Sequence, residues 1–111
     1  MSSLSTVAPD FVAEVAAALR SAGRADLVPQ LESGIVERWT YDPDADAGNI
    51  YRARPRPSWF FEKLPCPLAE TISFDEDNGI CIDVDRDGNL FGIEYMGRPD
   101  VLALLRRSDA L

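Results

Sequence analysis

The spacing of hydrophobic residues changes along the chain, from a helical period near the N-terminus to a period of two after residue 34. Apolar positions within residues 9–22 fall on one helical stripe, and Gly23 suits a C-terminal cap. Residues 25–34 predict a second, shorter helix in which Pro29 is tolerated only near the start. We therefore expect an N-terminal helical hairpin over residues 1–34.

Beyond this hairpin, apolar and polar residues alternate in short runs separated by turn residues, which is typical of half-buried strands. The predicted strands cover residues 35–41, 49–54, 69–75, 79–84 and 90–96. We expect them to form a five-stranded antiparallel meander over residues 35–97. Residues 98–107, with an apolar face and two arginines near the end, predict a helix within the C-terminal segment 98–111 that covers one face of the sheet. The fold class is therefore α+β.

Composition indicates one soluble domain over residues 1–111. The 111 residues are 46% hydrophobic, which is enough for a single core. A net charge of -8 repels phosphate backbones and argues against nucleic-acid binding. The N-terminus lacks the features of a signal peptide, and no apolar run is long enough for a bilayer, so we expect a cytoplasmic protein without a membrane partner. Cys66 and Cys81 are then expected to be reduced thiols without a redox role.

The stretch DVDRDGNLFGIE, residues 83–94, matches the ligand and turn positions of an EF-hand calcium loop. An EF-hand loop lies between helices, but both flanks here alternate with a period of two, so the sequence predicts a β-hairpin in which Gly88 has a positive φ. Glu94 would then lie about 20 Å along the strand from the turn. If a divalent ion binds, its ligands are Asp83, Asp85 and Asp87. Residues 41–48 repeat the acidic spacing and predict a turn capped by Asp42, in which Pro43 sets the first turn position.

These two acidic stretches together resemble the bacterial and archaeal family called domain of unknown function 2283. The matching residues are YDPDADA (41–47), IY (50–51) and ETISFDEDNGICIDVDRDGNLFGIEYM (70–96). The resemblance implies a small β-rich fold in which the second acidic turn is a hairpin, and it implies no catalytic residues. Some family members are encoded beside small toxin-like proteins, and this neighbourhood implies a neutralising, antitoxin-like role. The chain departs from the family pattern at its N-terminal helices, at Gly48 and Asn49, and in the loop 55–68.

The residues offer little for catalysis or cofactor binding. With no histidine, Ser-His and Cys-His nucleophilic pairs are impossible. A carboxylate-based enzyme is an alternative, for example with Asp75, Glu76 and Asp77, but an acidic cluster beside Asn78 and Gly79 is typical of a solvated turn. We predict no catalytic residues and no cofactor.

The proline-rich loop 55–68 and the strand before it carry the candidate interface. Arg52, Arg54 and Arg56 alternate, so an extended chain would point them to one side, either as solvated charge or as an anion-recognising patch. Trp59, Phe60 and Phe61 are consecutive and cannot all enter one core face; they either fold back over the sheet or anchor a partner.

The sequence thus favours a non-enzymatic protein-interaction module, as a homodimer or with a protein partner, with Trp59 near the centre of the contact. The alternatives are a calcium-binding module that uses the 83–87 turn and a carboxylate-based enzyme.

Overall fold

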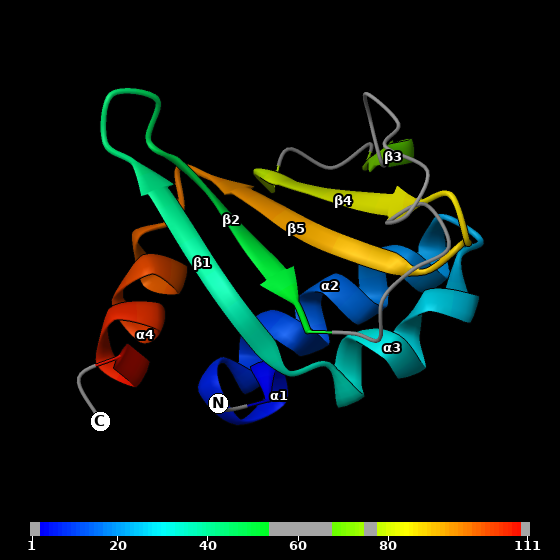
Figure 1. Cartoon of the computed structure of the whole chain (residues 1–111), viewed down its shortest axis with the longest axis horizontal. Coiled ribbons are helices and arrows are strands. Elements are labelled where there is room, and N and C mark those ends of the chain that lie inside the picture. The colour runs from blue at the N-terminus through cyan, green and yellow to red at the C-terminus, as the bar shows by residue number, and fades with distance from the viewer. Residues whose placement is uncertain (1–2, 54–67, 75–77, 110–111) are drawn as a thin grey trace.

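The computed structural model describes residues 3–53, 68–74 and 78–109. In chain order the elements are α1 (Leu4–Val7), α2 (Pro9–Ser21), the 3₁₀ helix η1 (Ala25–Leu27), α3 (Val28–Ser33), β1 (Val36–Asp42), β2 (Ala47–Arg52), β3 (Leu68–Ser73), β4 (Ile80–Asp85), β5 (Leu90–Met96) and α4 (Pro99–Asp109). This confirms the α+β class (Figure 1).

The predicted helical hairpin is present, with one addition at its start. α2 begins at Pro9 and ends before Gly23, which has the positive φ of +76° that its capping position requires. Pro29 lies in the first turn of α3, where its missing N–H removes no helical hydrogen bond. The sequence pattern missed α1, a single turn that Ser3 caps by accepting a hydrogen bond from the Thr6 N–H.

The five strands form one antiparallel sheet in the order β1-β2-β5-β4-β3, so the predicted meander order is wrong although all five strands are present. Short loops keep β1 beside β2 and place β4 between β3 and β5. The connection between β2 and β3 is long, so β3 lies at the far edge of the sheet and β5, not β3, pairs with β2. β5 is thus the central strand, and its Ile93 and Tyr95 are buried on the helical side of the sheet.

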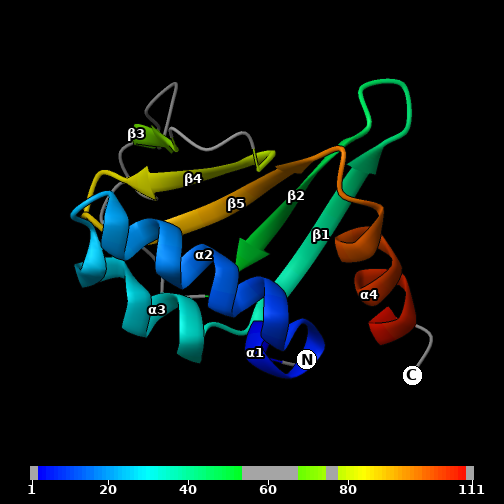
Figure 2. The same cartoon turned by 180° about the vertical axis from the view of Figure 1, so that it is seen from behind.

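All described helices pack against one face of the sheet, giving two layers around one core (Figures 1 and 2). The core combines apolar side chains of the four α-helices and η1 with those of β2, β4 and β5. α4 contributes Val101, Leu102 and Leu105 to it, which confirms that the C-terminal helix covers this face. Within the described ranges, no helix is both long and apolar enough to cross a membrane.

Arg98 connects three parts of this architecture just before α4. Its guanidinium donates to both carboxylate oxygens of Glu14 on α2, at 2.9 and 2.8 Å, and to the Asn78 carbonyl at 3.0 Å. It also donates to Asp100 in the first turn of α4. The Arg98 side chain is only 18% exposed, so its guanidinium itself is largely shielded from water.

Candidate interaction surface

The sheet face opposite the helices carries the most distinctive group of partly exposed side chains, and we call it the open face. Strand alternation places Asn49 and Tyr51 of β2 and Glu94 of β5 on this side, because Ile50, Ile93 and Tyr95 point into the core. Cys81 and Asp83 of β4 lie on the same side by their pairing with β5. The open face therefore combines an aromatic ring with carboxylates and a thiol.

Tyr51 is the centre of a small cation and aromatic group, which we call the Tyr51 cluster (Arg38, Tyr51 and Phe91). The Arg38 guanidinium lies over the Tyr51 ring, 4.0 Å from its centroid. Phe91 meets the same ring edge-on, with centroids 5.9 Å apart and an angle of 87°. Gly92 lies opposite Tyr51, and a Cβ there would be only 3.1 Å from the Ile50 carbonyl oxygen. The same Cβ would be 3.5 Å from Cδ1 of Tyr51, an ordinary van der Waals contact, so the Tyr51 ring lies directly beside Gly92.

Carboxylates accompany this cluster on the open face. Glu94 lies between Asn49 on β2 and Cys81 on β4, and its side chain is half-buried. Asp83 accepts a hydrogen bond of 2.8 Å from the Thr71 hydroxyl of β3. Because Arg24 and Arg98 make ion pairs with carboxylates elsewhere, they do not neutralise this face.

The acidic turn after β4 is the predicted hairpin. β4 and β5 pair directly, and Gly88 has a φ of +81°, as predicted. Glu94 pairs with Cys81, at the middle of the sheet and away from the turn. Across the described part of the chain, no three Asp, Glu or Cys side chains are grouped to hold a metal ion. The arrangement therefore explains the EF-hand-like spacing by turn geometry.

Asp85 has a role that the sequence pattern did not reveal. Its side chain is only 1% exposed, and its Oδ1 accepts the N–H groups of Asp87 and Asn89 at 2.9 and 3.0 Å. Gln30 of α3 holds the same turn from the helical side: its Oε1 accepts the Leu90 N–H at 2.7 Å, and its Nε2 donates to Asn89. The carboxylate that resembles a calcium ligand thus organises the hairpin from inside.

We expect Asp85→Ala to lower the free energy of unfolding by about 2 kcal/mol, because two backbone N–H groups lose their acceptor. Asp85→Asn keeps a carbonyl oxygen and should cost less. Urea unfolding of the parent, of both variants and of Asp87→Asn checks this, with each protein measured in calcium and in chelator. Stabilisation of the parent by calcium would contradict the turn interpretation, since a specifically bound ion stabilises the folded state by mass action.

The first acidic turn, between β1 and β2, also serves the backbone. The Asp42 Oδ1 accepts the Asp44 N–H at 3.0 Å, which confirms the predicted cap. Asp46 takes the left-handed conformation, with a φ of +49°, and accepts a hydrogen bond of 2.7 Å from the Tyr41 hydroxyl. This bond to a carboxylate is the main reason that the pKa of Tyr41 is raised above its ordinary value.

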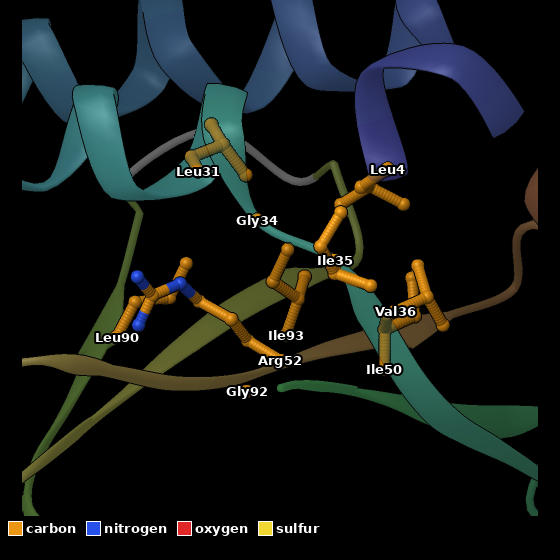
Figure 3. A pocket seen from close by; sticks show the side chains of 10 residues that line it. All are labelled: Leu4, Leu31, Gly34, Ile35, Val36, Ile50, Arg52, Leu90, Gly92 and Ile93. Carbon is orange, nitrogen blue, oxygen red and sulfur yellow. The ribbon is translucent and has the colours of Figure 1, made fainter. Parts of the chain in front are cut away.

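Of the predicted interface residues, the structure describes only Arg52. Arg52 lies on the helical side of β2 and is half-buried, with its side chain extending toward Leu90 (Figure 3). It lines a cavity of about 20 Å³ between α1, α3 and the sheet, together with apolar residues such as Leu31 and Ile93. This volume has room for about one water molecule and is far below that of a small-molecule pocket.

The remaining predicted residues lie outside the described ranges. These are Arg54, Arg56, Trp59, Phe60 and Phe61, the cysteine Cys66, and the acidic cluster of Asp75, Glu76 and Asp77. Their roles stay predictions. Cys81 is described: it is a free, half-buried thiol 3.8 Å from the Ser73 hydroxyl.

The sequence pattern did not single out Arg38, Tyr51 and Phe91. The alternation of apolar and polar residues in their strands indicates a half-buried sheet, but pairing across strands decides which side chains meet.

Comparison of the chain with models of protein families, with curated proteins and with solved structures finds no match.

Proposed function

We propose that this chain is a non-enzymatic protein-interaction module that binds a basic protein partner through its open face. The observation that carries the proposal is the Tyr51 cluster, a cation and aromatic group on the sheet face that the described helices leave uncovered. Aromatic side chains and arginine concentrate binding energy at protein interfaces.

The charge distribution favours a basic partner. The chain carries a net charge of -8, and the open face contributes Glu94 and Asp83 beside the aromatic rings. A lysine or arginine of the partner could contact an aromatic ring and one of these carboxylates at once. The long-range attraction would also increase the rate of association at low salt.

The resemblance to domain of unknown function 2283 supports a more specific form of this proposal. A neutralising, antitoxin-like accessory protein needs a surface for one partner and no catalytic apparatus, and the open face supplies such a surface. The proposal includes a cytoplasmic location with reduced thiols, which rests on the sequence alone.

Tyr51→Ser combined with Phe91→Ser should abolish binding to the partner, and Glu94→Gln should weaken it and reduce its salt dependence. The partner is first captured from the host lysate on the parent protein, then purified and measured by calorimetry at low and high salt. Glu32→Ser, which removes an exposed carboxylate on the helical side, is the matched control. A partner that binds the double variant as tightly as the parent would show that the open face is not the binding site.

A further inference from the structure

β1 is an edge strand of the sheet, and its hydrogen bonding to β2 shows which of its backbone groups face outward. The Thr40 carbonyl oxygen points toward β2, because it accepts a 3.3 Å hydrogen bond from the Tyr95 hydroxyl and would lie 2.4 Å from a Cβ on Gly48. In an antiparallel strand, the N–H and C=O of one residue point to the same side, and the side alternates. The N–H and C=O groups of Trp39 and Tyr41 therefore point away from the sheet.

The chain segment just before this stretch is already paired along the same edge. Ser3 forms an antiparallel bridge with Ile35, and the Leu4 N–H donates to the Gly34 carbonyl at 2.9 Å. The β1–β2 register then shifts between Val36 and Arg38, as in a β-bulge. Beyond this shift, outward-pointing and inward-pointing backbone groups alternate regularly again. Among the described residues, the edge left for pairing is the stretch 38–42.

We propose that a second copy of this chain pairs with the first, β1 against β1, in an antiparallel register centred on Thr40. Trp39 of each copy then exchanges backbone hydrogen bonds with Tyr41 of the other, and the two Thr40 residues face each other across a two-fold axis. The two sheets become one continuous sheet, and the interface is isologous, as in most homodimers.

Side-chain chemistry selects this register. On the open face it places Arg38 of each copy opposite Asp42 of the other, which pairs opposite charges twice across the axis. Both side chains are exposed in the single chain. The two Arg38–Asp42 pairs give two chains of net charge -8 attractive contacts where their β1 strands meet.

Neighbouring registers are less favourable. A register centred on Trp39 sets Arg38 opposite Thr40 and leaves Asp42 without a cation. A register centred on Tyr41 sets Arg38 opposite Asp44 in the turn, but it also sets Trp39 opposite Pro43, which has no N–H to donate. Registers shifted by a single residue bring outward-pointing groups opposite inward-pointing ones and form no ladder.

The helical side of the β1 edge carries two aromatic side chains. Trp39 and Tyr41 are half-buried and pack against the edge of the core, and the Arg106 guanidinium of α4 lies 5.7 Å from the Tyr41 ring centroid. In the proposed register Trp39 of each copy lies opposite Tyr41 of the other, so these side chains become cross-strand neighbours. An uncovered edge strand of this length is otherwise prone to uncontrolled pairing.

This inference goes beyond the proposed function, because it uses the β1 edge and not the Tyr51 and Phe91 rings. Arg38 belongs both to the Tyr51 cluster and to the β1 edge, so its variant affects both proposals. Thr40→Lys and Asp42→Arg change edge residues outside the cluster, and variants of Tyr51 and Phe91 change the cluster alone, so these variants test the two proposals separately.

The test is sedimentation of the full chain over a range of concentrations. The parent should be a dimer at micromolar concentration. Arg38→Asp and Asp42→Arg should each raise the dimer dissociation constant at least about tenfold, because each sets like charges opposite one another. The double variant, in which the two charges are exchanged, should restore the dimer.

Thr40→Lys provides a second, independent variant, because it sets two ammonium groups together at the axis on an exposed surface. It should yield monomers, whereas Ser73→Lys, an exposed position on β3 at the opposite edge of the sheet, should leave the dimer intact. A monomeric parent, a double charge variant that stays dissociated, or equal effects of the two lysine variants would each overturn the proposal.

Discussion

Gly48→Ala is expected to lower the free energy of unfolding by about 3 kcal/mol, because the substitution forces a methyl group into occupied space. A Cβ on Gly48 would lie 2.4 Å from the Thr40 carbonyl oxygen and 2.4 Å from the Tyr95 ring. Tyr95 is only 1% exposed, so close packing leaves its ring no room to move aside. The Thr40 carbonyl belongs to the β1–β2 ladder and is equally fixed.

Urea denaturation measures this effect, and Gly23→Ala is the matched control. Gly23 has a positive φ, but nothing lies within 4 Å of the position of its missing Cβ. Its substitution should therefore cost only the backbone strain, about 1 kcal/mol. Equal losses at the two glycines would contradict the steric explanation of Gly48.

Arg98→Ala is expected to cost about 2 kcal/mol at neutral pH, because it removes the hydrogen bonds that join α2, α4 and the turn before β4. Arg98→Lys should lie between the parent and the alanine variant, because an ammonium cannot reproduce the two parallel bonds to Glu14. Arg107→Ala, at an exposed position of α4, should be nearly neutral.

The Arg98 effect should also depend on pH in a defined direction. Hydrogen bonding to Arg98 lowers the pKa of Asp100 in the folded protein. A lowered folded pKa adds stability that is complete above the unfolded value, about 3.9, and is lost as the pH falls through the folded value. The difference in stability between the parent and Arg98→Ala should therefore shrink below about pH 4. A difference that is constant from pH 7 to pH 3 would show that Asp100 contributes nothing to it.

The open face illustrates why a site can be hidden in a sequence that otherwise predicts its fold well. The alternation in β2 and β5 indicates that Tyr51 and Glu94 point away from the core, but it does not indicate which strands are neighbours. Tyr51 meets Gly92 and Phe91 because β5 pairs with β2, a pairing that skips two strands in the chain. Likewise, the sequence grouped Arg52 with Arg54 and Arg56 as a stripe, whereas the structure places Arg52 on the helical side of the sheet.

Local rules determined the helices, the strands and the turns of this protein. The periods of hydrophobicity marked α2, α3, α4 and all five strands, and the chemistry of glycine and aspartate predicted the positive φ of Gly88 and the cap at Asp42. Only the tertiary structure decided the strand order, the burial of Asp85 and the contacts of Arg98 with Glu14 and Asn78. The physical reason is the sequence separation over which each effect acts: hydrophobic periodicity and turn chemistry depend on a few neighbouring residues. Strand order and buried polar contacts instead depend on which distant segments can share one core, and therefore on the whole chain at once.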